Sequence, residues 1–158
     1  LAIFRMRSAL DKSIPSETGM ELVIIRPPLV YGNNAKGNFV AILKLIDLGI
    51  PLPFASLHNK RSLVSIDNLV NLITICITHE KAANQTFLVS DGIDLSSADL
   101  IRKIARSVNK KAILFPFPQF FIKLILHLIG KKNIVQRIYG SLQVDITKTR
   151  ETLGWQPV

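Results

Sequence analysis

The sequence predicts an α/β fold in which short buried strands alternate with amphipathic helices. Residues 21–27 (ELVIIRP) form a continuous apolar run rich in β-branched residues, typical of a strand buried on both faces of a parallel sheet. Apolar side chains recur at helical spacing through residues 67–78. With 158 residues, 48% of them hydrophobic, the chain is long enough to bury the core of one domain.

The remaining elements follow from periodicity and from turn residues. Because the expected strands lie far apart with helices between them, we expect parallel βαβ pairing. The expected strands are residues 21–27, 61–66, 86–92 and 112–115. The expected helices are residues 6–17, 38–49, 67–78, 99–108, 118–129 and 146–154, and residues 28–37 are expected to form a loop.

Capping residues set the predicted helix ends. Asp67 and Asp145 are predicted as N-caps, and Gly49 as the C-cap of its helix. Ser96, followed three residues later by Asp99, resembles a capping box with an aspartate in place of the usual glutamate.

Composition narrows the classes of partner. The chain carries 20 Lys and Arg against 11 Asp and Glu, but no basic run has interleaved aromatic residues, so we expect no nucleic-acid partner. The single cysteine, Cys76, excludes an internal disulfide and a cysteine-rich zinc site, and we expect a buried thiol and a cytoplasmic location. The histidines share no metal-like spacing, so no metal is expected.

The most apolar stretch, residues 112–130, is interrupted by Pro116 and Pro118. Its uninterrupted part is shorter than the roughly 20 apolar residues that a membrane span needs. We expect no membrane contact, although an amphipathic helix over residues 120–129 leaves binding at a membrane surface open as an alternative.

Five segments occur in this order and spacing: VIIRPPLVYGNNAKGNF, KRSLVSIDNLVNLI, NQTFLVSDG, DLIRKIARSV and GSLQVDITKTRETLGWQP. Together they resemble the C-terminal half of an extended short-chain dehydrogenase/reductase, and more narrowly the NAD-dependent nucleotide-sugar epimerase/dehydratase family. The resemblance implies the C-terminal part of a Rossmann-like fold, with residues 18–158 as its substrate-binding part and residues 1–17 as a remnant of the helix that carries the catalytic motif. Full-length relatives of this kind epimerise or reduce the C4 position of UDP-sugars for O-antigen or capsule synthesis.

The motif R-P-P-x-x-Y-G is expected to end the first strand, because its two prolines remove backbone donors and fix φ. Ligands of open α/β sheets bind at such strand ends. The resemblance places Pro27 and Pro28 near the cofactor, NAD, and Leu29 near the substrate diphosphate. Tyr31 is equally well explained as part of a structural turn.

The resemblance also assigns four substrate-binding residues downstream. Asn38 and Phe39, at a helix N-terminus, would hold the nucleotide, although an N-cap and a core residue explain them as well. Arg61 would donate two hydrogen bonds to the UDP diphosphate; the alternative is that Arg61 is a solvated surface charge. Arg137 would be a second diphosphate-binding arginine, whereas Trp155 is expected to pack the last helix.

Two parts of the family's chemistry are missing from the sequence. It contains no G-x-x-G-x-x-G turn for the NAD pyrophosphate. The resemblance aligns LAIFR with the motif Y-A-I-S-K, so Leu1 and Arg5 stand where the catalytic tyrosine and lysine are expected, and no catalytic residue is assigned. Leucine has no proton to exchange with a sugar hydroxyl.

The sequence therefore leaves three functions open. The chain is part of a UDP-sugar epimerase or reductase whose N-terminal Rossmann half comes from elsewhere, including a separate chain. Alternatively, it is a catalytically inactive split-gene remnant that binds UDP-sugar at most, or a basic interaction module at a membrane surface. A chain without its partner half is expected to expose apolar surface and to self-associate.

Overall fold

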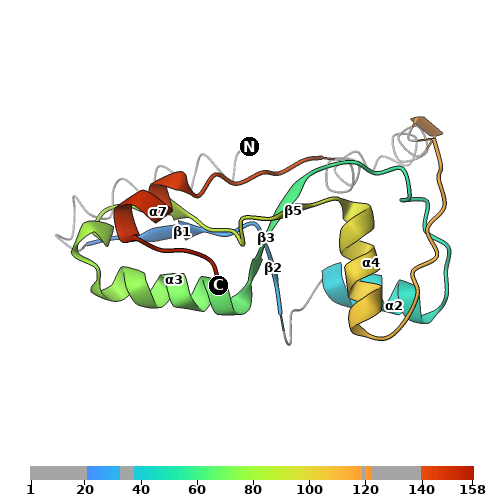
Figure 1. Cartoon of the computed structure of the whole chain (residues 1–158), viewed down its shortest axis with the longest axis horizontal. Helices are drawn as coiled ribbons and strands as arrows, with labels where there is room; N and C mark the ends of the chain where they lie inside the picture. Colours follow the sequence, from blue (N-terminus) through green and yellow to red (C-terminus); the bar gives the residue numbers. More distant parts are fainter. Residues whose placement is uncertain (1–20, 33–37, 119, 122–139) are drawn as a thin grey trace. The chain divides into compact units, whose positions relative to one another are not determined.

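The computed structural model describes residues 21–32, 38–118, 120–121 and 140–158 (Figure 1). It divides into two compact units. Unit 1 comprises residues 1–30, 64–92 and 144–158, and unit 2 comprises residues 31–63 and 93–143. The α/β class is confirmed, since short strands and helices alternate along the described chain.

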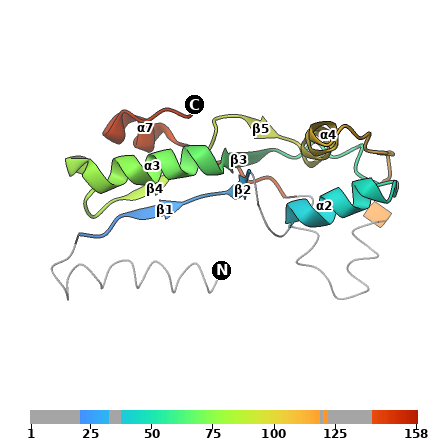
Figure 2. The same cartoon turned by 90° about the horizontal axis from the view of Figure 1, so that it is seen from below.

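Unit 1 is built on a parallel strand pair. Strands β1 (Ile24–Arg26) and β4 (Thr86–Leu88) pair in parallel with Ile25 opposite Phe87, as the sequence predicts. Helix α3 (Ile66–Thr78) runs along this pair, a short 3-10 helix η1 (Glu80–Ala82) follows it, and α7 (Thr147–Leu153) contacts β4 (Figure 2). The expectation that β1 is buried on both faces is wrong, because all three of its residues are half-buried.

The core of unit 1 joins these elements through large apolar side chains. Phe87 of β4 and Leu72 of α3 are fully buried, and Cys76 is buried beside them as expected. Trp155 is 2% exposed and belongs to the same core. Its indole Nε1 donates a hydrogen bond of 2.9 Å to Oδ1 of Asn71, which confirms that Trp155 packs the C-terminal end of the chain.

The predicted helix ends are partly confirmed. Ser65, not Asp67, is the N-cap of α3, because the Ser65 Oγ accepts from the backbone N–H of Asn68 at 3.1 Å. Asp67 lies in the first turn, where a carboxylate favours the helix dipole. Ile146, not Asp145, is the N-cap of α7, although Asp145 Oδ1 accepts from the backbone N–H of Thr147 at 2.9 Å.

In unit 2, α4 (Ser97–Ser107) begins at its predicted cap, since Ser96 Oγ accepts from the N–H of Asp99 and donates to its carboxylate. Helix α2 (Asn38–Asp47) contacts α4 and ends through Gly49, whose φ of 64° is left-handed. The Gly49 N–H donates to Ile46 and the Ile50 N–H to Leu45, the pattern of a Schellman motif.

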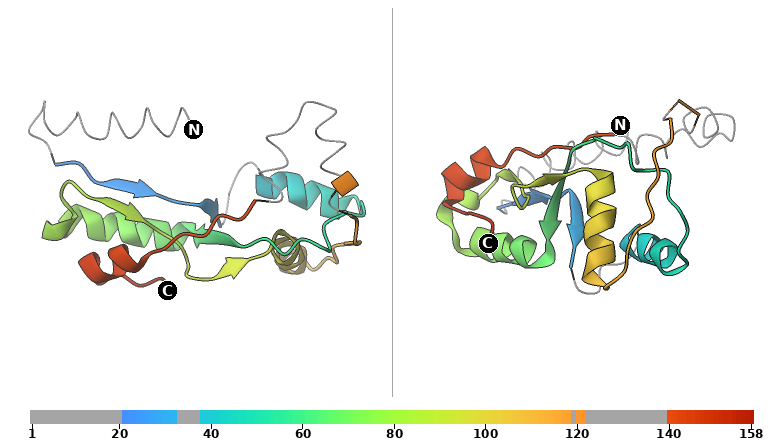
Figure 3. Two further views of the ribbon diagram at one scale, coloured as in Figure 1. Left: turned by 90° about the horizontal axis from the view of Figure 1, so that it is seen from above. Right: turned by 45° about the vertical axis from the view of Figure 1, so that its right-hand side comes forward.

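A second sheet has the strand order β2-β3-β5 and corrects three expectations (Figure 3). Strand β2 (Leu29–Tyr31) occupies part of the expected loop, because its β-favouring side chains re-enter a sheet directly after the two prolines. Strand β3 (Arg61–Ser65) was expected, but its partner β5 (Asp94–Leu95) was not, and the two pair antiparallel. The strand expected at residues 112–115 is reduced to a single bridge between Leu114 and Leu52.

Candidate functional site

The candidate site is centred on Arg61, the first residue of β3. Its backbone is flanked on both sides, because Arg61 pairs with Leu95 of β5 in antiparallel fashion and forms a parallel bridge with Leu142. The neighbouring Ser62 N–H donates to the Leu142 carbonyl at 2.8 Å, and the Leu142 N–H donates to the Lys60 carbonyl at 2.8 Å. The main chain at Arg61 is therefore fixed by ladders on either side.

Asn59, two residues before Arg61, holds the segment that leads into β3 through its side-chain hydrogen bonds. Its side chain is buried, and its Nδ2 donates to Ser97 Oγ at 3.0 Å and to the Gly140 carbonyl at 3.2 Å. Its Oδ1 accepts from the Ser97 N–H at 2.9 Å. One side chain thus joins the start of β3, the N-terminus of α4 and the segment that begins at residue 140.

Ser62, Asp94 and Gln143 form a polar network next to Arg61. Ser62 Oγ donates to Asp94 Oδ1 at 2.6 Å, and Gln143 Nε2 donates to Asp94 Oδ2 at 2.6 Å. These two hydrogen bonds lower the pKa of the Asp94 carboxyl. Because successive strand residues point to opposite faces, the network lies on the other face of β3 from the Arg61 side chain.

Burial shapes the electrostatics of Arg61 itself. The side chain is half-buried, and desolvation lowers the pKa of its guanidinium. An arginine stays protonated under working conditions in spite of such a shift, so a cation is kept in a partly desolvated place. A fixed and partly desolvated guanidinium interacts more strongly with a phosphate than a fully solvated one does.

The other predicted site residues are less fully defined. Pro27 is exposed and Pro28 half-buried between β1 and β2, and Leu29 is the half-buried first residue of β2. Asn38 and Phe39 open α2, so the predicted helix N-terminus is confirmed there, but their side chains are outside the described part.

Three further predicted positions, Leu1, Arg5 and Arg137, lie outside the described residues altogether. Leu29 and Arg61 belong to different units. The described geometry of the site is therefore that of Arg61 and its supports.

The sequence reasoning identified Arg61 but missed the residues that position it: Asn59, Ser62, Asp94 and Gln143. One local signal was available, since Ser62 is a polar residue inside an expected strand, whereas Asn59 stands before that strand between His58 and Lys60. The side chain of a buried asparagine needs hydrogen-bond partners for its NH2 group and for its carbonyl oxygen, so it often organises a loop. Asp94 and Gln143 carried no comparable signal, because each is distant from Arg61 along the chain.

The residues present do not fit NAD on their own. The pyrophosphate of a dinucleotide binds at a strand-to-helix turn whose glycines let the backbone approach closely. The two fully described turns of this kind, before α3 and before α4, contain Ser65 and Ser96 as caps and no glycine. At the end of β1, Pro27 and Pro28 offer no backbone N–H donors.

Within the described part of the chain, no group of three or more His, Cys, Asp or Glu side chains is arranged to hold a metal ion. Among the same residues, no helix combines the length and the apolar character that crossing a bilayer requires. Cys76 is buried, and its desolvation raises the pKa of the thiol, so a reactive thiolate is disfavoured there.

Comparison with known proteins gives several relatives that are epimerases. The chain is 53% identical over 146 residues to a UDP-glucose 4-epimerase of Vibrio cholerae, covering 92% of this chain and 44% of that protein. The crystal structure of a UDP-glucose 4-epimerase from Thermotoga maritima with UDP-glucose superposes with a TM-score of 0.62 at 18% identity, covering 95% of this chain and 46% of that one. The enzyme WbmG of Bordetella bronchiseptica, in complex with NAD and UDP, gives 0.64 at 16% identity, covering 90% and 41%. No family model matches the sequence.

The chain is thus similar to part of a UDP-glucose 4-epimerase, and its fold matches part of solved nucleotide-sugar epimerase structures. It spans less than half the length of the curated relatives it matches.

Proposed function

We propose that this chain forms the nucleotide-sugar-binding part of a UDP-sugar 4-epimerase, in which Arg61 binds the diphosphate. The observation that carries the proposal is a half-buried guanidinium whose backbone is held between β5 and the segment around Leu142. Two of the relatives are 4-epimerases, which supports epimerisation rather than reduction or dehydration.

The chemistry of the ligand explains why this position suits an arginine. A diphosphate carries two negative charges and several acceptor oxygens, and a guanidinium can donate two parallel hydrogen bonds to a phosphate. Fixing the backbone of Arg61 beforehand reduces the conformational entropy that binding would otherwise cost. Asn59 contributes to this preorganisation as a positioning residue, since it ties the start of β3 to α4 and Gly140.

The remaining contacts in this proposal follow the family resemblance. Leu29 lies along the diphosphate, Asn38 and Phe39 hold the nucleotide, and Arg137 is a second diphosphate ligand. Pro27 and Pro28 lie near NAD, whose pyrophosphate would be held by residues outside this sequence. NAD supplies the hydride chemistry when the enzyme is whole, and the residues of this chain bind and orient the sugar nucleotide.

We further propose that the chain does not turn over UDP-sugar by itself. In place of the expected tyrosine and lysine it has Leu1 and Arg5, and the leucine cannot act as a general acid or base. The NAD-binding turn would come from the other half of the fold, on the same polypeptide or on a separate chain, whereas the positions of the acid–base pair are those that Leu1 and Arg5 would occupy. The split-gene remnant and the membrane-surface module are the outcomes that would replace this proposal.

The test is titration calorimetry of UDP into the chain. Replacing Arg61 with alanine removes a charge-assisted hydrogen bond worth about 1.5–3 kcal/mol, so we expect affinity to fall roughly 10- to 100-fold. Arg61→Lys keeps the charge but not the fork, and we expect an intermediate loss.

Arg102→Ala is the matched control, because Arg102 is an exposed arginine of α4 whose guanidinium pairs with Asp99 on the surface. It should leave UDP binding unchanged. Equal losses in the Arg61 and Arg102 variants would show that UDP responds to net charge alone and would refute the site. Epimerisation of UDP-glucose by the isolated chain would refute the claim that it lacks essential parts.

A further inference from the structure

The net charge of the chain comes from one stretch of the sequence. Residues 100–144 contain nine of the 20 Lys and Arg and no Asp or Glu. The other residues contain eleven Lys and Arg against eleven Asp and Glu, so together they carry no net charge. Nearly all of the basic stretch, residues 100–143, belongs to unit 2. Such a concentration of one charge favours a partner of the opposite charge.

Aromatic side chains are exposed in the middle of the same stretch. Phe120 and Phe121 are 69% and 51% exposed, and Phe115 is exposed as well. The rings of Phe115, Phe117, Phe121 and Phe120 contact one another in this order, edge to face, with centroids 5.8 to 6.1 Å apart. The four phenylalanines therefore form one apolar cluster that is open to solvent.

Positive and apolar side chains share one face of the segment that leads into this cluster. Exposed and half-buried residues alternate from 111 to 115, and the exposed ones are Lys111, Ile113 and Phe115. Leu114 points the other way and forms a bridge with Leu52. Because residues two apart in an extended segment point to the same side, Lys111 lies on the face that carries Ile113 and Phe115. We call Lys111, Ile113 and the four phenylalanines the aromatic surface.

Helix α4 adds positive charge to the same unit. Its exposed side carries Arg102, Lys103 and Arg106, whereas its buried side is apolar. Arg102 pairs with Asp99. Within the described part of the chain, no carboxylate forms an ion pair with Lys103, Arg106 or Lys111. These three cations are therefore not neutralised by the protein itself.

We infer that the aromatic surface binds the face of an anionic phospholipid bilayer. The phenylalanine rings and Ile113 enter the headgroup region, and Lys111 and the cations of α4 are attracted by the lipid phosphates. Apolar burial and attraction to anionic lipids act together in this kind of binding. The inference goes beyond the proposed function and does not depend on it, because Arg61 and the residues that support it are not part of the aromatic surface.

This inference differs from the expectation of no membrane contact that the sequence favours. That expectation rests on the length of the apolar stretch, but contact with a bilayer surface requires no spanning segment. The exposure of the rings and the position of Lys111 beside them became visible in the structure. The helix expected over residues 120–129 lies outside the described residues beyond Phe121, so the aromatic surface is defined without it.

Two other occupants fit the aromatic surface less well. A second copy of the chain would bring two surfaces of the same charge together, and like charges repel. Single-stranded nucleic acid stacks its bases on open aromatic faces. Here the rings pack against one another edge to face, and Ile113 offers no ring for stacking. Both occupants are competing outcomes of the test.

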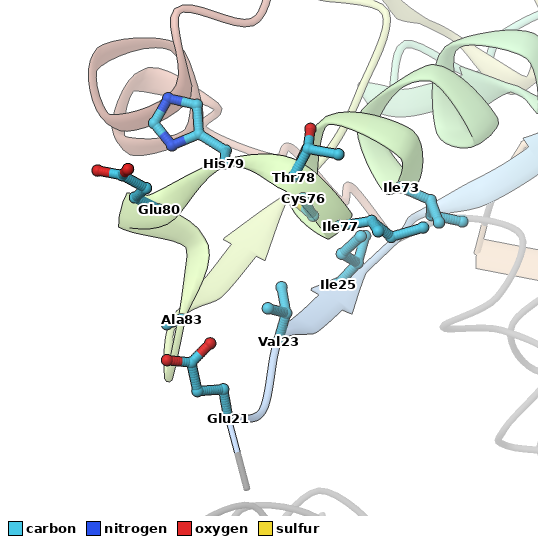
Figure 4. A pocket seen from close by; sticks show the side chains of 10 residues that line it. All are labelled: Glu21, Val23, Ile25, Ile73, Cys76, Ile77, Thr78, His79, Glu80 and Ala83. Carbon is cyan, nitrogen blue, oxygen red and sulfur yellow. The ribbon is translucent and has the colours of Figure 1, made fainter.

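A groove in unit 1 gives an internal comparison, because it is also apolar but has acidic side chains around it. Its volume is about 610 Å³, and Ile77, which lines it, is 77% exposed. Figure 4 shows Glu21 and Glu80 beside the apolar side chains of this groove. Anionic lipid would be repelled by these carboxylates, so we expect no bilayer contact there. Charge, and not exposure alone, distinguishes the aromatic surface.

The test is co-sedimentation of the full chain with vesicles of phosphatidylglycerol and phosphatidylethanolamine, and with vesicles of phosphatidylcholine alone. We expect binding to the anionic vesicles, weakened by added salt because salt screens exposed charges. Phe120→Ala removes one exposed ring and should weaken binding about tenfold. Lys111→Glu reverses one charge next to the membrane and should weaken binding roughly 30-fold.

Each variant has a matched control in unit 1. Ile77→Ala truncates an exposed apolar residue of the groove, and Lys81→Glu reverses the charge of an exposed lysine of η1. Both should bind the anionic vesicles as the parent does, and circular dichroism should show that all four variants are folded.

Three results would overturn the inference. The first is equal binding to both kinds of vesicle, or equal losses in the surface variants and their controls. The second is a homodimer, seen by analytical ultracentrifugation, that Phe120→Ala disrupts while the parent binds no vesicles. The third is binding of single-stranded RNA in preference to anionic vesicles, with the same sensitivity to Phe120→Ala and Lys111→Glu.

Discussion

Arg61 illustrates how a single charged residue depends on uncharged neighbours. Burying a guanidinium is unfavourable unless its surroundings compensate. Here the backbone on both sides of the residue is paired and Asn59 fixes the start of the strand, so the half-buried guanidinium extends from a fixed main chain. The carboxylate of Asp94 is engaged by Ser62 and Gln143, which makes it a structural group rather than a catalytic one.

Asp94→Asn tests this structural assignment through its pH dependence. Two hydrogen bonds lower the folded-state pKa of Asp94, so the group stabilises the fold above its unfolded pKa of about 4. That contribution is lost as pH falls through the lower, folded pKa. Urea unfolding at pH 7 should show the variant less stable than the parent, and the difference should shrink as the pH is lowered below about 4.

Asp145→Asn is a suitable control for this titration, because the pKa of Asp145 is also lowered, but by Thr147 on a different unit. The loss of stability caused by Asp145→Asn should also shrink as the pH is lowered, and the variant should bind UDP as the parent does. A stability difference for Asp94→Asn that stays constant from pH 7 to below 4 would contradict the role of the charged carboxylate.

At the scale of elements, α3 organises unit 1 because its side chains hold other segments of the unit in place. Its buried Asn68 donates from Nδ2 to Asp91 at 2.7 Å and accepts at Oδ1 from the Val158 N–H at 3.0 Å. Asn71, one turn further on, accepts from Trp155. Two asparagines of one helix therefore hold the C-terminal residues against it.

Asn68→Leu should destabilise the protein by about 2 kcal/mol, because it removes the part-buried hydrogen bonds from Asn68 to the Asp91 carboxylate, which keeps the Ser65 N–H, and from the Val158 N–H to Asn68. Asn71→Leu is the matched change on the same helix. Since Asn71 is exposed and water can replace it, we expect a loss of about 1 kcal/mol or less. Chemical denaturation measures both, and equal effects would contradict the importance of the buried pair.

Sequence reasoning reached the elements with strong periodicity and failed where pairing depends on distant residues. Helices α2, α3 and α4 were predictable because their apolar spacing and the residues at their ends are local signals. Strand β5 has two residues and forms because they pair with Arg61 and Ser62. No local sequence pattern predicts this pairing. The same reason explains why Arg61 could be predicted whereas Asp94 and Gln143, its distant neighbours in space, could not.

At the scale of the whole molecule, the described residues contain no dinucleotide cradle. The serine-capped turns before α3 and α4 suit helix starts rather than the close backbone approach of a pyrophosphate. We therefore expect the isolated chain to bind one of its two expected ligands and not the other.

We expect the isolated chain to bind UDP but not NAD. The reason is that the proposed diphosphate ligand, Arg61, is part of this chain, whereas the serine-capped turns before α3 and α4 offer no pyrophosphate site. Titration calorimetry with each ligand measures the two affinities. Arg61→Ala should weaken the binding of UDP. Saturable binding of NAD by the isolated chain would contradict this division, because it would require a phosphate site that its serine-capped turns do not offer.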